Sequence, residues 1–207
     1  MSYTVQKLIS IAETEVGYLE KASNSNLDSK TGNAGGANWT KYARDLANAG
    51  YYNGNKNGYA WCDVFVDWCH WIASNKDSKE AQRVICQTGA YGAGCVYSAD
   101  YYRAKGRYSK EPKVGDQIFF GNTGDEYHTG IVYKVDSSRV YTIEGNTSSD
   151  SGVVDNGGGV FKKSYNRSYY EINGYGHPYY EGEIPSSVEE KDDLLSVGDT
   201  GSAVKKL

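Results

Sequence analysis

Apolar residues recur at helical spacing through the first third of the chain. Between residues 4 and 19 they fall three or four positions apart, which predicts an amphipathic helix. The segment NWTKYARDLANAG predicts a short second helix that ends at Gly50. A third helix is predicted from about Trp61 to Ser74, with Cys62 on its apolar face. Between the first two helices lies a long loop rich in Ser, Asn and Gly, of a kind that often carries function.

The pattern changes further along the chain from helical to alternating. A loop that contains Gly and Cys leads to a short helix or turn, SADYYRAKG. Four strand-like segments follow, separated by Gly, Asn, Asp and Ser: VGDQIFF, HTGIVYKV, RVYTIEGN and GVFKKSY. Helices followed by a strand meander predict an α+β domain, with N-terminal helices packed on one face of a central antiparallel sheet.

The second and third of these strands can be aligned by their apolar residues. A three-residue turn at 136–138 lets Val135 face Arg139 and lets Ile131 face Ile143, so that apolar side chains meet. A register shifted by one residue would place Ile131 opposite a glutamate, which is a poor match. We therefore expect the first of these two registers.

This register brings three polar residues to one end of the other sheet face: His128, Glu144 and Asn146. A thiol becomes a strong nucleophile when a helix N-terminus and an imidazole favour its ionised form. Cys62 opens its predicted helix, so we expect it to be the nucleophile and His128 the general base. Glu144 or Asn146 would orient the imidazole. Each residue also has an ordinary alternative, since buried cysteines usually fill space and a histidine that opens a strand is usually an edge residue.

The other histidines fit this role less well. His70 lies two turns along the same helix as the thiol and cannot reach it, while His177 lies in a turn near the end of the domain. Three aromatic residues flank the predicted catalytic positions and could line a substrate groove, although packing is an equally good explanation for the tryptophan: Tyr59, Trp61 and Tyr127.

The chain has four cysteines, Cys62, Cys69, Cys86 and Cys95, without the spacing of a zinc site. Cys86 and Cys95 flank a glycine-rich loop and could form a disulfide. Two reduced thiols are the alternative, which we slightly favour. The proposed chemistry requires no cofactor, and we expect no metal.

Composition excludes some classes of function. A formal net charge of −4 argues against a nucleic-acid binder. No apolar stretch is long enough to insert into a membrane, and the N-terminus lacks the pattern of a secretory signal. The 25 glycines and 20 tyrosines suit a carbohydrate or peptide ligand, although strands also collect tyrosine for packing. We expect a monomer.

Four motifs in this order, WCDVFVDWC, VGDQIFF, HTGIVYKV and YTIEGNT, resemble a CHAP domain (cysteine, histidine-dependent amidohydrolase/peptidase), a papain-like relative of NlpC/P60 proteins. The chain is particularly similar to CHAP modules of endolysins from phages and prophages of Gram-positive bacteria. The resemblance covers residues 3–180. It implies cleavage of an amide bond in bacterial peptidoglycan, either the N-acetylmuramoyl–L-alanine amide or one in the stem peptide or cross-bridge.

The resemblance also implies a role for each matching residue. Cys62 matches the nucleophile, His128 the general base, Glu144 the residue that orients it, and Asn146 a further polar residue of the site. Some relatives carry an acidic calcium loop before the cysteine. Here that region reads YYNGNKNGYAW, which argues against bound calcium.

We expect three parts: a CHAP catalytic domain at 1–180, an acidic linker at 181–193, and at 194–207 the truncated start of a peptidoglycan-binding repeat. The place of action would be the bacterial cell wall, reached by holin-type release or another route. Two alternatives are a non-catalytic wall-binding module with a decayed site and a papain-like peptidase that acts on proteins.

Overall fold

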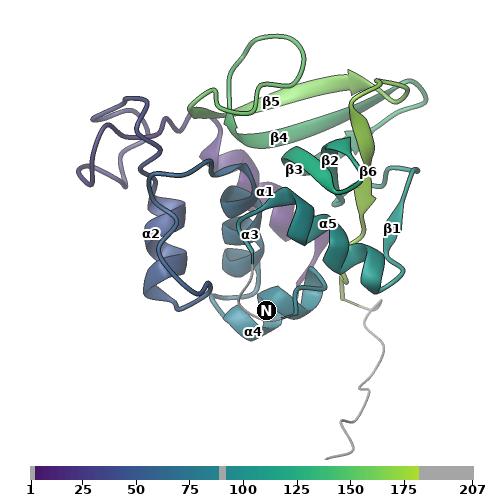
Figure 1. Ribbon diagram of the computed structural model, residues 1–207, viewed down its shortest axis with the longest axis horizontal. Helices are drawn as coiled ribbons and strands as arrows, with labels where there is room; N and C mark the ends of the chain where they lie inside the picture. The colour runs from purple at the N-terminus through teal and green to yellow at the C-terminus, as the bar shows by residue number, and fades with distance from the viewer. Residues whose placement is uncertain (1–2, 89–91, 182–207) are drawn as a thin grey trace, which may run out of the picture.

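A computed structural model describes residues 3–88 and 92–181 of the chain (Figure 1). Within them the helices gather on one side of an antiparallel sheet, which makes an α+β fold as predicted. The helices are α1 (Val5–Glu15), α2 (Lys41–Asn48), α3 (Cys62–Ala73), α4 (Ser78–Val84) and α5 (Cys95–Ala104). The strands are β1 (Tyr108–Ser109), β2 (Gln117–Asn122), β3 (Asp125–Val135), β4 (Arg139–Thr147), β5 (Gly159–Asn166) and β6 (Ile172–Gly176).

Two parts of the expected organisation are not described by the structure. The predicted repeat at 194–207 and all of the predicted linker except its first residue lie outside the described residues. No helix among the described residues is both long enough and apolar enough to cross a bilayer.

The helix ends follow from local hydrogen bonds. The Thr4 hydroxyl accepts a hydrogen bond from the Lys7 N–H at the start of α1. The expectation of a helix to residue 19 is wrong, because α1 ends at Glu15 and the N–H of Gly17, at φ +88°, instead donates to the Val160 carbonyl of β5. Gly17 therefore turns the chain toward the sheet.

The agreement with the prediction varies among the other helices. The second helix begins at Lys41 because Thr40 caps it with its side chain. Helix α4 was not predicted: it is a short helix capped by Asp77, whose carboxylate accepts from two N–H groups in the first turn. The third predicted helix is confirmed, since α3 lies within one residue of the expected bounds at each end.

Helix α3 runs through the core and is buried along almost its whole length. Its first turn packs aromatic side chains against α2, where the rings of Tyr42 and Phe65 meet edge to face at 5.3 Å. The same helix contacts β3 and β4 of the sheet. Because α3 touches both layers, its first residue lies where helices and sheet meet.

The observed pairing of β3 with β4 confirms most of the predicted register. Ile131 lies opposite Ile143, as expected. The predicted three-residue turn is wrong, because a bulge near Tyr133 shifts the pairing by one residue and sets Val135 opposite Val140. The cause lies in the turn itself, where the Asp136 carboxylate accepts from the N–H groups of residues 138 and 139 and fixes a tighter loop.

The sheet contains two strands that the sequence did not predict. Strand β6 pairs with the edge of β2 that faces away from β3, and β1 pairs with β6 at the edge of the sheet. A Cβ atom at Gly176 would lie 2.2 Å from the ring of Tyr102, so this glycine lets α5 pack directly on β6.

Candidate active site

Cys62 is the first residue of α3, and its side chain is almost fully buried. The first N–H groups of a helix have no partner within it, so they form a positive end that favours a thiolate. The preceding residue, Trp61, is held in the core by a 2.8 Å hydrogen bond from its indole Nε1 to Glu20. This anchor fixes where the helix begins and therefore where the thiol lies.

His128 and Glu144 form a buried pair on adjacent strands of the sheet. Nε2 of His128 lies 2.9 Å from Oε2 of Glu144, and both side chains are inaccessible to solvent. The carboxylate is satisfied by two further donors, the Thr142 hydroxyl at 2.5 Å and the Tyr165 hydroxyl at 3.2 Å. The imidazole is thus oriented by a carboxylate that is itself held in place.

Gly130 makes room for this pair. A Cβ atom at this position would lie 2.5 Å from Cγ of Glu144 and 3.0 Å from the Ile143 carbonyl oxygen. Any larger residue would displace the carboxylate from the imidazole.

The second nitrogen of His128, Nδ1, has no hydrogen-bond partner among the described residues. Because Nε2 is bound to Glu144, Nδ1 is the nitrogen left to interact with the Cys62 thiol. Burial lowers the pKa of His128, but its interactions with Cys62 and Glu144 outweigh burial and raise this pKa to about 10. The imidazole is therefore protonated at neutral pH.

The pKa of the Cys62 thiol is lowered well below its usual value. A hydrogen bond with Cys95 is the largest cause, His128 adds to it, and burial opposes both. Both directions favour a thiolate at Cys62 beside a protonated His128. This is the arrangement on which cysteine nucleophilic catalysis depends.

Asn146 lies two residues after Glu144 on the same strand, but its side chain binds elsewhere. Its buried Nδ2 donates to the Asp155 carbonyl at 3.0 Å, and its backbone has φ +55°, where the pairing of β4 with β5 shifts. No hydrogen bond to His128 is recorded for it among the described residues. Its Oδ1 is buried without a partner there. A role for Asn146 in the site stays a prediction.

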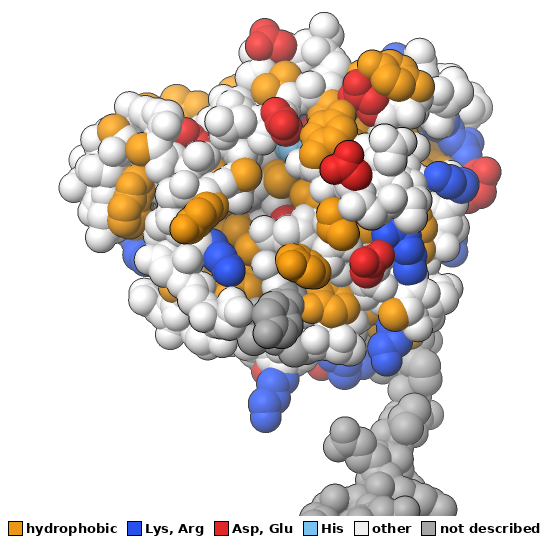
Figure 2. All heavy atoms as spheres, viewed as in Figure 1, with side chains coloured by type: hydrophobic (Ala, Val, Ile, Leu, Met, Phe, Trp, Pro, Cys, Tyr) orange, Lys and Arg blue, Asp and Glu red, His pale blue; other side chains and the backbone are white. Residues whose placement is uncertain are grey.

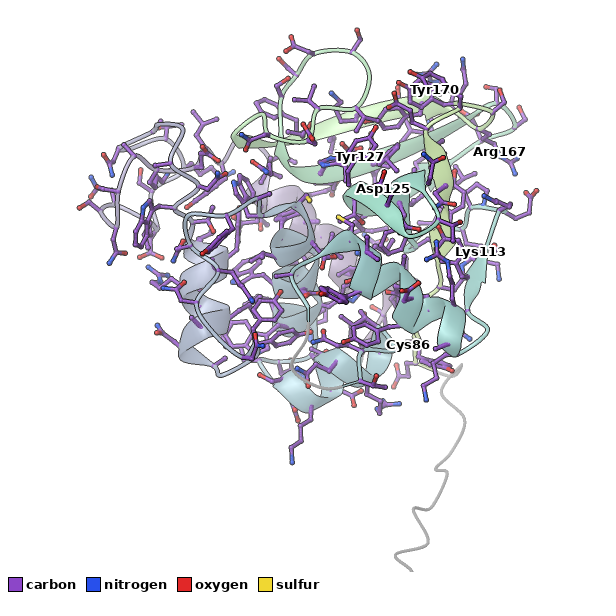
Figure 3. The ribbon with its side chains drawn as sticks, viewed as in Figure 1. Cys86, Lys113, Asp125, Tyr127, Arg167 and Tyr170 are labelled. Atoms are coloured by element: carbon purple, nitrogen blue, oxygen red, sulfur yellow. The ribbon has the colours of Figure 1, made fainter. Side chains whose placement is uncertain are left out.

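The three aromatic residues predicted to bind substrate separate into two groups. Tyr59 and Tyr127 are 68% and 41% exposed, and hydrophobic side chains surround a hollow on the face shown in Figure 2. The Tyr127 hydroxyl donates to Glu171 at 2.8 Å, which orients its ring (Figure 3). Trp61 is fully buried, so the packing explanation applies to it and its assignment to substrate contact is corrected.

The two remaining histidines form hydrogen bonds away from the His128–Glu144 pair. His70 is fully buried beside the Tyr3 hydroxyl, and burial lowers its pKa to about 3. His177 is hydrogen-bonded to Asp116 at 2.7 Å and to Ser109 at 2.8 Å. Both fasten distant parts of the chain together.

Sequence reasoning missed two residues of the site. Tyr165 supports Glu144 from β5, and the alternation of that strand could have indicated it. Cys95 lies with its sulfur 3.7 Å from that of Cys62, a contact that no local pattern shows. All four cysteines are free, so a disulfide between Cys86 and Cys95 is absent from the structure. Among the described residues, no group of three or more His, Cys, Asp or Glu side chains could hold a metal ion.

Comparison with known proteins gives a family match over part of the chain. The model of the CHAP domain family matches residues 54–146, which include Cys62, His128 and Glu144, so the predicted CHAP domain is confirmed over that range. No curated protein matches the chain.

Two similar solved structures are both of Ly7917, and one of them is with the hydrolyzing product of MDP. They share 15% identity with this chain and have TM-scores of 0.46 and 0.47. The match covers 84% of this chain and 62% of theirs, so the chain spans less than two thirds of the length of Ly7917.

Proposed function

We propose that this protein hydrolyses an amide bond of bacterial peptidoglycan, with Cys62 as the nucleophile and His128 as the general base. The observation that carries the proposal is the buried His128–Glu144 pair beside a thiol at a helix N-terminus. The family match over residues 54–146 supports it, because those residues contain the whole pair and the thiol.

The chemistry follows from the charges at the site. The Cys62 thiolate attacks the carbonyl carbon of the amide, and the N–H groups at the start of α3 stabilise the negative oxygen that forms. The His128 imidazolium then gives its proton to the leaving amine, which breaks the carbon–nitrogen bond and leaves a thioester on Cys62. Neutral His128 next takes a proton from water, and the resulting hydroxide releases the acid. Glu144 keeps the imidazole oriented through both steps.

The substrate class is inferred from the two exposed aromatic residues that the sequence predicts to bind substrate. Tyr59 and Tyr127 expose aromatic rings that can stack on sugar rings or on peptide groups. The bond cleaved is then either the N-acetylmuramoyl–L-alanine amide or an amide of the stem peptide or cross-bridge. The enzyme would act at the bacterial cell wall, as an endolysin or as a bacterial wall hydrolase, with residues 194–207 as the start of a wall-binding repeat.

The test is digestion of purified peptidoglycan with the wild type and with Cys62→Ala, followed by mass spectrometry and analysis of new amino termini. A new N-terminal L-alanine that depends on Cys62 would identify an amidase. New ends within the stem peptide or cross-bridge would identify an endopeptidase.

The matched control is Cys69→Ala, which removes another buried thiol of the same helix. This variant should release the same fragments as the wild type, because Cys69 has no place in the proposed chemistry. Folded Cys62→Ala that still releases fragments at the wild-type rate would overturn the proposal. So would the absence of Cys62-dependent fragments from several wall types.

A further inference from the structure

The nucleophile has a second thiol against it. Sγ of Cys95 lies 3.7 Å from Sγ of Cys62, and both side chains are buried. The separation is far beyond the ~2.05 Å of a disulfide bond, and both cysteines are free. It is the distance of a hydrogen bond between two sulfurs.

Cys95 occupies in α5 the position that Cys62 occupies in α3, since each is the first residue of its helix. Asp63 holds the two helix starts together. Its carboxylate accepts a 2.8 Å hydrogen bond from the Ser98 hydroxyl of α5 and a 2.9 Å bond from Gln117 of β2. Because this carboxylate joins α3, α5 and the sheet, the contact between the sulfurs is built into the fold.

The charges decide which sulfur is the donor. Cys62 interacts with the His128 imidazole and therefore carries the negative charge. The pKa of Cys95 is raised well above its usual value by its hydrogen bond to Cys62, by burial, and by the charges of Cys62 and Asp63. Cys95 accordingly keeps its proton, so its S–H is the group that can donate a hydrogen bond to the Cys62 sulfur.

We propose that Cys95 is a positioning residue whose S–H donates a hydrogen bond to the Cys62 thiolate, so that the nucleophile stays ionised and fixed in direction. The inference rests on the proposed function in one respect, that Cys62 is the nucleophile. Four titratable groups surround that sulfur and its partner imidazole: Cys95 from α5, Asp63 from α3, His128 from β3 and Glu144 from β4.

The experiment measures the rate at which iodoacetamide alkylates Cys62 as a function of pH, with the modified peptide quantified by mass spectrometry. Three variants are compared with the wild type: Cys95→Val, of similar size but without a donor; Cys95→Ser, which keeps a donor; and Cys69→Ala, which removes a thiol of α3 with no recorded contact to Cys62. Circular dichroism verifies that each is folded.

Cys95→Val, which lacks the donor, should need a higher pH to form the Cys62 thiolate. A hydrogen bond to a charged group corresponds to about one pKa unit or more, so Cys95→Val should react about tenfold more slowly at pH values below its midpoint. Cys95→Ser should return the midpoint toward that of the wild type, and Cys69→Ala should not move it. A purely packing role for Cys95 would leave the midpoint of Cys95→Val unchanged, and that result overturns the inference.

The assay separates this inference from the proposed function, because alkylation requires no peptidoglycan. A shifted midpoint without any digestion of walls would support the donor role of Cys95 and contradict the hydrolase. Digestion that depends on Cys62, together with an unshifted midpoint in folded Cys95→Val, would support the hydrolase and contradict the donor role.

Discussion

Replacing Glu144 with glutamine tests the electrostatic core of the site. The substitution keeps the shape of the side chain and an oxygen that can accept from Nε2 of His128, but it removes the negative charge. In the native protein, burial disfavours the imidazolium, and the interactions with Cys62 and Glu144 outweigh burial. In Glu144→Gln, the Cys62 thiolate is the remaining negative charge that opposes burial.

The magnitude follows from the 2.9 Å bond between Nε2 and the carboxylate. A hydrogen bond to a charged group is worth about 1.5–3 kcal/mol, and one pKa unit corresponds to about 1.36 kcal/mol. The pKa of His128 should therefore fall by about one to two units from its native value of about 10. Activity that needs the imidazolium should be lost at a correspondingly lower pH on its alkaline side.

The assay is titration of the histidine ring protons by NMR. The chain has three histidines, which keeps the spectrum simple. Asp116→Asn is the matched control, because it removes the carboxylate that lies 2.7 Å from the ring of His177 and leaves the pair in the site intact. The thiolate and the imidazolium are coupled, so the midpoints belong to the pair and are compared between variants.

The reasoning is refuted if His128 in folded Glu144→Gln still titrates near pH 10. An equal fall in the pKa of His128 in the Asp116→Asn control would also refute it. The fall would then not come from the loss of the Glu144 charge.

Two further predictions concern stability. Gly130→Ala should destabilise the fold by about 1–3 kcal/mol, because the new Cβ would lie 2.5 Å from Cγ of Glu144; an unchanged midpoint of urea unfolding would contradict this. His70 has a folded pKa of about 3 against 6.5 in the unfolded chain, so the unfolded state binds more protons between these values and stability falls as the pH falls through that window. From pH 6.5 to pH 5 the loss should be about 1.6 kcal/mol, and His70→Phe should show a smaller loss in the same urea experiment.

Local patterns were sufficient to predict much of the fold and of the site. Helix α3 was found from the spacing of its apolar residues, and the pairing of β3 with β4 from the need to match Ile131 with Ile143. That register in turn placed His128 beside Glu144, which the structure confirms as a direct contact. A period of 3.6 or 2 sets which residues share a face, so neighbours on one element or on adjacent strands can be read from the chain.

The ends of the elements and the turns between them depend on hydrogen bonds that the spacing of apolar residues does not indicate. The turn between β3 and β4 differs from the predicted one because the Asp136 carboxylate accepts hydrogen bonds from two backbone N–H groups. The alignment of apolar residues could not indicate these bonds. Helix α1 stopped early because Gly17 turned toward β5, which lies far away in sequence. The strand β6 was missed because INGYG is short and rich in glycine, and its partner β2 lies more than 50 residues earlier.

The sequence by itself determined that a thiol opens a buried helix and that an imidazole and a carboxylate meet on adjacent strands. Only the tertiary structure decided that Trp61 is buried in the core, that Asn146 is turned toward a loop, and that Cys95 lies against the nucleophile. The physical reason is the range of the interactions. Spacing along one element fixes its own faces, whereas the approach of α5 to α3 depends on how both helices pack on the sheet and on the carboxylate that joins them.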